Sequence, residues 1–321
     1  MKKLNIISPI YNEEKNLENL IDKLLLIEKK IQNQFNLQTS IILVNDGSND
    51  ESYNIIEKYE KKFNQIKGLH LTKNFGHQTA IFAGLSEFKA DYYIAIDSDL
   101  QQDPENIILM LQTLFSTNCQ IIQMKKKYFN YENKIKSLFS KFFYSIFLKL
   151  TNIDIKQGSS DFYLIDNVVR DSIVKSKFSG HFLRGFIHWT GYSKAFIEYT
   201  PQKRSEGKSK YNFLRQLEFA LTGLYFYSSK IPVYIFLLAL SIGFLCLIYF
   251  IFILTEFFIY GIPTPGWASN TIIILFFGAI NILFNSIMIF LIFKIFNTVG
   301  NKPTYLKKEK ETKDTHANKN N

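Results

Sequence analysis

The chain has 321 residues and carries 38 Lys and Arg against 28 Asp and Glu, a formal net charge of +10. Hydrophobic residues make up 47% of the chain, and its two cysteines, Cys119 and Cys246, offer neither a disulfide framework nor a zinc site. A basic chain of this size suits a nucleic acid or an anionic membrane surface, and the placement of its apolar residues distinguishes the two.

The first hundred residues alternate apolar strands with amphipathic helices. Strands are predicted at 4–10, 40–46, 67–72 and 92–99, and helices at 12–31, 51–63 and 77–88. Strands separated by helices of this length pair in parallel, because a parallel crossover needs about a dozen residues. The pattern therefore predicts an α/β fold with a doubly wound, mostly parallel sheet.

Polar residues follow three of these strands, at 9–13, 45–47 and 97–99. In parallel sheets ligands bind at the carboxyl ends of the strands, which all lie at one edge. The three clusters therefore predict a single site.

Asp97 and Asp99 are the most informative residues of that edge. On a continuing strand they point the same way, so their charges repel unless a cation lies between them. Mg²⁺ or Mn²⁺, with oxygen ligands completed by substrate phosphates, meets that need. The alternative is that one aspartate caps the following turn while the other is solvated.

Two long stretches, 233–255 and 271–293, contain no charged residue. Each is long enough as a helix, roughly 35 Å at about 1.5 Å per residue, to cross a bilayer. The loop 256–270 between them has no Lys or Arg, whereas basic residues precede the first stretch and follow the second. The positive-inside rule then places the large domain and the C-terminus in the cytoplasm, and a membrane rather than a nucleic acid is the expected partner.

The chain is therefore divided into four parts. Residues 134–150 have helical apolar spacing that fits either a helix on the sheet or one at the membrane, whereas 211–230, directly before a span, favours an interfacial helix. We expect a cytoplasmic catalytic domain at 1–210, an amphipathic juxtamembrane helix at 211–230, a two-helix transmembrane hairpin at 231–298 and a basic, disordered tail at 299–321.

Five motifs follow one another in order: SPIYNEEKNL (8–17), VNDGSND (44–50), KNFGHQTAIFAGL (73–85), IAIDSDLQQDPE (94–105) and RSEGKSKY (204–211). In this order they resemble family-2 inverting glycosyltransferases of the GT-A fold. The match is closest to the polyprenyl-phosphate sugar transferases, namely dolichol-phosphate mannose synthase and the bacterial bactoprenol-phosphate glucosyltransferases, and it covers nearly the whole chain before the tail. The resemblance implies a GT-A, Rossmann-like sheet with flanking helices.

On the donor side, the resemblance implies a nucleotide-sugar site with a divalent metal. Pro9, Tyr11 and Glu13 would line the nucleotide pocket, and Asp46 would contact the base or ribose. Asp97 and Asp99 would hold Mg²⁺ or Mn²⁺ on the donor diphosphate, with Gln101 as an additional ligand.

On the acceptor side, the resemblance implies that Asp161 faces the acceptor and that a loop carrying Arg204, Ser209 and Lys210 closes over the site and binds phosphate. In the alternative interpretation, Arg204 and Lys210 bind no substrate phosphate and simply lie beside lipid headgroups.

Two donor-side residues also have structural alternatives: Glu13 as a helix cap and Asp46 as a stabiliser of its Asp-Gly turn. His77 is interpreted as part of a helix start and is left out of the catalytic set.

Two positions depart from the family pattern. Relatives usually have arginine where this chain has Tyr163, so a phosphate contact must come from elsewhere, with Lys125, Lys126 and Lys127 as candidates or simply a solvated charge run. Asp103 replaces a proline or histidine of many relatives, and the sequence predicts no effect for it.

The resemblance implies inverting transfer of a sugar, from a UDP-sugar rather than a GDP-sugar, to undecaprenyl phosphate, for modification of a cell-envelope glycan. The expected location is the bacterial inner membrane, and the further candidate partners are a flippase, a second transferase and a second copy of the chain. Two alternatives stay open: a processive polysaccharide synthase, and a non-catalytic membrane protein that binds sugar nucleotides. The sugar itself is not predicted.

Overall fold

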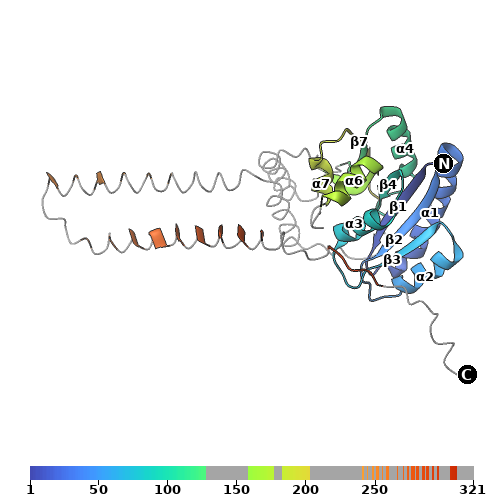
Figure 1. The fold of residues 1–321 in the computed structure, drawn as a ribbon, viewed down its shortest axis with the longest axis horizontal. Coiled ribbons are helices and arrows are strands. Elements are labelled where there is room, and N and C mark those ends of the chain that lie inside the picture. The colour runs from blue at the N-terminus through green and yellow to red at the C-terminus, as the bar shows by residue number, and fades with distance from the viewer. Residues whose placement is uncertain are drawn as a thin grey trace, which may run out of the picture. The chain divides into compact units, whose positions relative to one another are not determined.

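The computed structural model describes residues 1–127, 158–176, 183–202 and 304–308, together with scattered residues between 241 and 295 (Figure 1). The chain forms two compact units, one of Met1–Tyr227 with Thr304–Asn321 and the other of Ser228–Pro303. The predicted helices at 134–150 and 211–230 lie outside the described residues, as do Arg204, Ser209 and Lys210.

A seven-stranded sheet forms the centre of the first unit, in the order β3-β2-β1-β4-β6-β5-β7 (Figure 1). β1, β2, β3 and β4 pair in parallel and β7 is parallel to β5, whereas β6 runs antiparallel to both of its neighbours. The predicted α/β class and mostly parallel sheet are therefore confirmed. The strands are β1 (Lys3–Ile10), β2 (Gln38–Asn45), β3 (Ile66–His70), β4 (Tyr92–Ala95), β5 (Ile121–Lys126), β6 (Ser159–Asp166) and β7 (Lys194–Tyr199).

Helices cover both faces of this sheet (Figure 1). On one face lie α1 (Glu14–Phe35), α2 (Ser52–Lys62) and α4 (Asn106–Thr117), and on the other lie α3 (His77–Glu87), α6 (Asn167–Lys175) and α7 (Leu183–Trp189). The central strands are buried on both faces, which explains why β1 and β2 read as continuous apolar runs. The helix α1 is amphipathic, as predicted, and buries an apolar stripe that includes Leu17, Leu20 and Leu24.

The fourth strand is shorter than the sequence predicts. β4 ends at Ala95, and the chain then turns, with Leu100 in the left-handed region at a φ of +59°. Asp97 and Asp99 therefore lie in a turn instead of on a continuing strand, and strand alternation does not explain their orientation.

The antiparallel strand β6 brings Asp161 to the end of β4. Tyr92 pairs with Asp166 and Ala95 with Tyr163, so each step forward along β4 is one step back along β6. Ala95 is the last paired residue of β4, and Asp161 lies two residues before its partner Tyr163, beside the turn that carries Asp97. Two carboxylates that are distant in the sequence thus meet at one edge of the sheet.

The described part of the tail, residues 304–308, is ordered against the sheet, which corrects the predicted disorder for these five residues. The Thr72 N–H donates to the Leu306 carbonyl oxygen at 3.0 Å, and the Lys308 N–H to that of His70 at 2.8 Å. Glu87 accepts from the Tyr305 hydroxyl at 2.8 Å and pairs with Lys307 at 2.9 Å. Backbone pairing at the β3 edge and the apolar contact of Tyr305 with Phe82 hold this segment.

In the second unit, most of the residues described between 241 and 295 are helical. Among the residues that the structure describes, no helix is long and apolar enough to cross a membrane. The spans at 233–255 and 271–293 lie largely outside those residues and stay a prediction, as do the four domain boundaries.

Candidate active site

The loops after β1 and β2 are joined to each other by side-chain hydrogen bonds. The Asn12 N–H donates to Ser48 Oγ at 3.0 Å, and the Asn49 N–H to Asn12 Oδ1 at 2.9 Å. Asn12 has a φ of +53°, a conformation that asparagine tolerates better than most residues. Two of the three predicted polar clusters therefore form one continuous rim.

Asp46, directly after β2, is buried and binds the loop that leads into α3. Its Oδ1 accepts the Phe75 N–H at 2.7 Å, and its Oδ2 accepts the Gly76 N–H at 3.0 Å. Burial raises the pKa of Asp46, although these two hydrogen bonds oppose the rise. Asp46 thus holds this loop instead of its own Asp-Gly turn, and its contact with a base or ribose stays a prediction.

Gly47 lets the same loop come close. Its φ is +67°, and a Cβ at this position would lie 2.4 Å from the backbone carbon of Lys73. Only glycine combines this conformation with such a close approach. The end of β2 therefore fixes where α3 begins.

The turn after β4 is organised around its two aspartates. The Asp97 N–H donates to Gln102 Oε1 at 2.9 Å, and Gln102 Nε2 donates a short hydrogen bond to Asp97 Oδ2. Asp99 Oδ1 accepts the Gln101 N–H at 3.1 Å, as in an Asx turn. The expected turn-capping role of one aspartate is present here, while the metal role predicted for the pair stays open.

Asp161, at the start of β6, is held by two cationic side chains. Arg184 Nε donates to Asp161 Oδ1 at 2.9 Å, and Arg184 Nη2 lies 2.7 Å from Oδ2, a two-point contact. Arg184 Nη1 also donates to the Ser159 carbonyl oxygen at 2.9 Å. The other neighbour is His77, whose Nε2 lies 3.5 Å from Asp161 Oδ2.

His77 connects this carboxylate with the turn after β4. Its Nε2 also lies 3.2 Å from Asp97 Oδ1, and the side chain keeps 31% exposure. Burial lowers the pKa of His77, but Asp161 and Asp97 outweigh burial and raise that pKa well above its usual value. The two carboxylates therefore favour the protonated, cationic form of the imidazole.

The same contacts determine the charge of Asp161. Burial alone would raise the pKa of Asp161, but the Arg184 guanidinium and His77 hold that pKa well below its usual range. Asp161 is thus a permanent carboxylate and a weak base. Tyr163, two residues along the strand, is buried, and burial together with Asp161 raises its pKa well above the usual value.

The three predicted residues at the end of β1 are placed differently from one another. Pro9 lies within β1 and pairs in register with Val44, whereas Tyr11 and Glu13 lie on the rim. Glu13 precedes α1, but its side chain accepts from Asn16 Nδ2 at 2.9 Å and caps no backbone N–H. Their nucleotide contacts stay predictions.

The two departures from the family pattern have local explanations. Asp103 Oδ1 accepts the Glu105 N–H at 3.0 Å, and its Oδ2 accepts from Gln202 Nε2 at 2.9 Å. It therefore supports the start of α4 and ties residue 202 to this turn. Lys125, a candidate phosphate contact, pairs with Glu198 at 3.0 Å.

Sequence reasoning missed three residues of the site. His77 does begin α3, as interpreted, but it also contacts both carboxylates. Gln102 had a visible signal, because an amide directly after the acidic pair can fold back onto it. Arg184 had none, since it lies 23 residues from Asp161 and only the packing of α7 brings them together.

The donor atoms near Asp97 fit a hard divalent cation. Within the described part of the chain, no cluster of three or more His, Cys, Asp or Glu is arranged to hold a metal ion. Asp97 Oδ1 is nevertheless a buried carboxylate oxygen whose neighbour is His77 Nε2 at 3.2 Å, so it has lone-pair capacity left for a cation. Carboxylate oxygens from Asp97 and Asp99, completed by ligand phosphates, are the donor set that Mg²⁺ and Mn²⁺ use.

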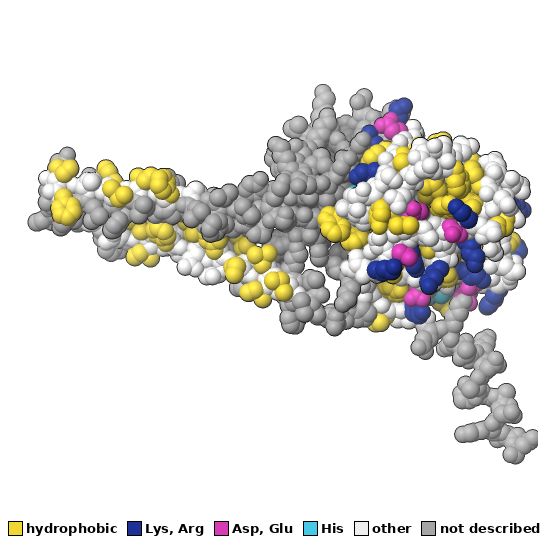
Figure 2. All heavy atoms as spheres, turned by 45° about the horizontal axis from the view of Figure 1, so that its top comes forward, with side chains coloured by type: hydrophobic (Ala, Val, Ile, Leu, Met, Phe, Trp, Pro, Cys, Tyr) yellow, Lys and Arg dark blue, Asp and Glu magenta, His cyan; other side chains and the backbone are white. Residues whose placement is uncertain are grey.

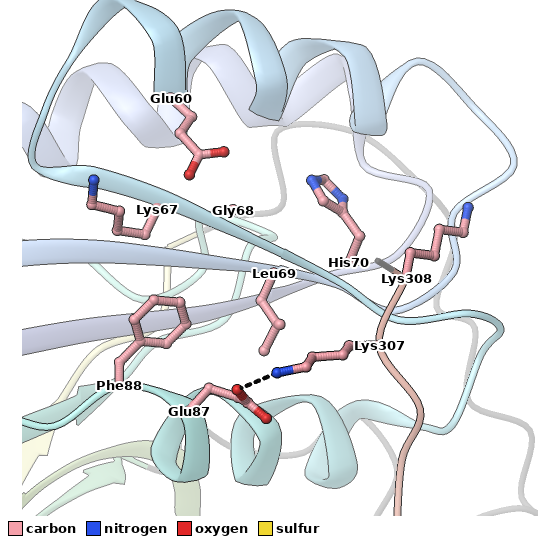
Figure 3. Close-up of a pocket in the computed structure, with 9 residues that line it drawn as sticks. All are labelled: Glu60, Lys67, Gly68, Leu69, His70, Glu87, Phe88, Lys307 and Lys308. Atoms are coloured by element: carbon pink, nitrogen blue, oxygen red, sulfur yellow. Dashed lines mark hydrogen bonds and ion pairs between the residues drawn. The ribbon is translucent and has the colours of Figure 1, made fainter. Parts of the chain in front are cut away.

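A hollow of about 500 Å³ lies elsewhere, along the β3 edge (Figure 3). Its charged groups do not converge on one point: Lys307 points to Glu87, Lys308 points away, and Glu60 lies across the strand (Figure 3). His70 is turned toward Glu57, at 3.3 Å. This hollow is the groove where the tail segment meets the sheet edge, and it is separate from the acidic edge.

Fold and site together define a class of protein. It is an α/β protein with a mostly parallel sheet, an acidic turn after a central strand and a second carboxylate on an antiparallel neighbour, and sheets of this kind bind ligands at that edge.

Comparison with known proteins identifies the class more closely. Residues 5–175 match glycosyl transferase family 2. An uncharacterized glycosyltransferase of Synechocystis sp. is 30% identical over 305 residues, 94% of each chain. A prophage-derived bactoprenol glucosyl transferase of Shigella flexneri is 27% identical over 310 residues, 96% of this chain and 98% of the relative. A prophage bactoprenol glucosyl transferase homolog of Escherichia coli is 28% identical over 284 residues, 88% and 90% of the two chains.

The chain belongs to glycosyl transferase family 2 and is a glycosyltransferase. The resemblance seen in the motifs is thereby confirmed.

Proposed function

We propose that this enzyme transfers one sugar, with inversion, from a UDP-sugar to the phosphate of a membrane polyprenyl phosphate, undecaprenyl phosphate. The observation that carries the proposal is the likeness to a bactoprenol glucosyl transferase over 96% of this chain and 98% of the relative. The likeness extends through the apolar C-terminal third, so it concerns more than the sugar-nucleotide domain. The product would supply a sugar for modifying a cell-envelope glycan.

The state of Asp161 supports a phosphate acceptor. A phosphate monoester has a second pKa of about 6, so it is already mostly anionic at neutral pH and needs little general-base help. Asp161, whose pKa lies below its usual range, is poorly suited to remove a proton. It is better suited to orient its neighbours, and a sugar hydroxyl acceptor would need a stronger base.

The positive charge around Asp161 supports the same reading. Arg184 and His77 bring two cations close to where an anionic acceptor would meet an anionic donor. These cations lower the repulsion between the two ligands, which is a form of electrostatic catalysis. Arg204, Ser209 and Lys210 are proposed to add phosphate contacts from their loop.

On the donor side, Asp97 and Asp99 would hold Mg²⁺ or Mn²⁺, with Gln101 as a further ligand. When bound, the metal would neutralise charge on the donor diphosphate and stabilise it as a leaving group. Pro9, Tyr11, Glu13 and Asp46 would form the nucleotide pocket. Gln102 fixes the orientation of Asp97 before any ligand arrives.

We propose that 233–255 and 271–293 cross the bacterial inner membrane, with the catalytic domain and the C-terminus in the cytoplasm. Described positions in this part of the chain present large apolar side chains at the surface (Figure 2), and Phe244, Phe258, Ile259 and Ile274 are each more than 60% exposed. Such exposure is costly in water and favourable in lipid. A membrane anchor would hold the site where the lipid phosphate emerges and so raise its effective concentration.

The test is product formation by the full-length protein in detergent. Undecaprenyl phosphate is supplied with a panel of UDP- and GDP-sugars, with Mg²⁺ or Mn²⁺ and with a chelator. We expect one sugar to appear on the lipid only when metal is present. The proposal is wrong if every donor in a complete panel leaves the lipid unmodified, or if a growing polymer forms instead, as a polysaccharide synthase would make.

Asp99→Asn is run beside the wild type to link the activity to this site. We expect at least a hundredfold loss of transfer, the size typical of removing one electrostatic contact to a developing charge. Lys58→Ala, which removes an exposed ion pair with Glu18, is the control and should transfer normally.

A further inference from the structure

The imidazole of His77 lies between two carboxylates that come from different strands. Its Nε2 is 3.2 Å from Asp97 Oδ1 and 3.5 Å from Asp161 Oδ2. Asp97 follows β4, and Asp161 lies near the start of β6, so the contact crosses from the turn after one strand to its antiparallel neighbour. A single group with two such partners transmits a change at one of them to the other.

The backbone of His77 is held in place by the residues on either side of it. Asp46 holds the backbone of Phe75 and Gly76, and α3 is buried from Gln78 to Leu85. The ring therefore cannot follow one carboxylate by moving its own backbone. Both contacts use the single N–H of Nε2, so a stronger hydrogen bond to Asp97 weakens the one to Asp161, and the reverse.

Each carboxylate also has a partner of its own. Gln102 orients Asp97, and Arg184 binds Asp161 at two points. These partners hold each carboxylate in place, and His77 joins the two pairs into one chain of contacts. Residues that share such a network show interaction energies that separate sites do not.

We propose that His77 is a positioning residue that couples the donor-side carboxylate Asp97 to the acceptor-side carboxylate Asp161. The coupling rests on the proposed function, which places the donor at Asp97 and the acceptor at Asp161. Without Asp161, His77 keeps Asp97 as its one carboxylate partner and holds it more firmly. Asp97 is then less available to the donor and its cation, so an acceptor-side change weakens donor binding.

A plain helix-start role for His77 makes a different prediction. A residue that only begins α3 would affect stability, and its removal would change the affinity for the donor equally whether or not Asp161 is present. The two readings are therefore separated by a thermodynamic cycle and not by the loss of activity in one variant.

The experiment measures Mn²⁺·UDP binding by calorimetry to four full-length proteins in detergent: wild type, Asp161→Asn, His77→Ala and the double variant. With His77 present, we expect Asp161→Asn to weaken binding by about fivefold, a coupling of ordinary size for residues in contact. With His77 replaced by Ala, the same substitution should change the affinity by less than twofold. Equal effects in both backgrounds, or no effect in the wild-type background, would overturn the proposal.

Two further variants make the result specific. His77→Gln places an amide N–H near the position of Nε2 and should restore part of the coupling, and it replaces the Ala variant if that protein does not fold. His70→Asn is the matched control, because His70 is also a buried histidine beside a carboxylate, with its Nε2 3.3 Å from Glu57 Oε1 at the β3 edge. In that background Asp161→Asn should keep its full effect, and loss of the effect there would contradict the proposal.

The cycle also separates failure of the coupling from failure of the proposed function. If neither UDP nor GDP binds the wild type with Mn²⁺, the proposed function is wrong. The same four proteins are then titrated with Mn²⁺ alone, and a dependence of the Asp161→Asn effect on His77 still decides the coupling.

Discussion

Asp46 and Asp161 are both buried carboxylates at the same edge of the sheet, but their surroundings differ. Asp46 is held by two backbone N–H groups of the loop before α3, and burial raises its pKa. Asp161 is held by Arg184 and His77, and these cations lower its pKa despite burial. Neutral donors suit a carboxylate that organises backbone, whereas cations suit one whose charge is kept for ligands.

The largest effect is expected from removing Arg184, the guanidinium that binds Asp161. Arg184→Leu would leave Asp161 as a buried carboxylate that keeps its ion-pair contact with His77 and loses the one with Arg184. We expect a loss of about 3 kcal/mol in the free energy of unfolding, at the low end for a broken buried pair because His77 remains. Transfer should fall about a hundredfold as Asp161 shifts.

Thermal unfolding and initial transfer rates measure the two effects of Arg184→Leu. The exposed pair Lys30 with Glu105 provides a control, since Lys30→Ala should change neither quantity measurably. A stable, fully active Arg184→Leu protein would show that the cations around Asp161 are unimportant.

Asp46→Asn tests the other member of the comparison. The amide keeps the shape but can accept only one of the two backbone N–H groups, so one is left unpaired. We expect a loss of about 1–3 kcal/mol in the free energy of unfolding, the cost of a buried unsatisfied donor. Because the loop before α3 loosens, the KM for the nucleotide sugar should rise more than kcat falls; a fall in kcat alone would contradict this role.

The pH dependence of stability should have opposite signs for the two residues. The pKa of Asp161 is lowered in the folded state, so its contribution is present above about pH 4 and is lost as the pH falls below that value. The pKa of Asp46 is raised, so its contribution decreases as the pH rises above about 4.

Thermal unfolding between pH 3.5 and 7 checks these signs. The stability difference between wild type and Asp161→Asn should grow with pH, and the difference between wild type and Asp46→Asn should shrink. Equal slopes for the two variants would mean that the contrast between the two sites is wrong.

Glu87 is a third carboxylate, which lies at the surface and binds the tail segment. Its substitution shows how large an effect an exposed carboxylate has, compared with the two buried ones. Glu87 accepts from the Tyr305 hydroxyl and pairs with Lys307, and these contacts lower its pKa. Glu87→Gln should cost about 0.5–1 kcal/mol in the free energy of unfolding, as for exposed pairs, and should leave transfer unchanged. Hydrogen exchange at Thr72, whose N–H bonds Leu306, should quicken if the tail segment is released.

Much of the first unit could be predicted from the sequence, because its signals are local. Alternating apolar strands and amphipathic helices indicated β1 to β4 with their helices, and the parallel class followed from the length of the crossovers. The motif order indicated the family, which the match over residues 5–175 confirms. The ordered segment at 304–308 was missed, because a polar, lysine-rich sequence has no local signal for pairing with a distant strand edge.

For the site, the sequence by itself determined which carboxylates gather at the edge of the sheet, since strand ends and motifs are read along the chain. Only the tertiary structure decided what each carboxylate contacts. The antiparallel pairing of β6 with β4 brings Asp161 to the turn that carries Asp97, and the packing of α3 and α7 brings His77 and Arg184 to them. The physical reason is that charge states and hydrogen-bond partners depend on distances across the fold, and these are set by packing between elements far apart in the chain.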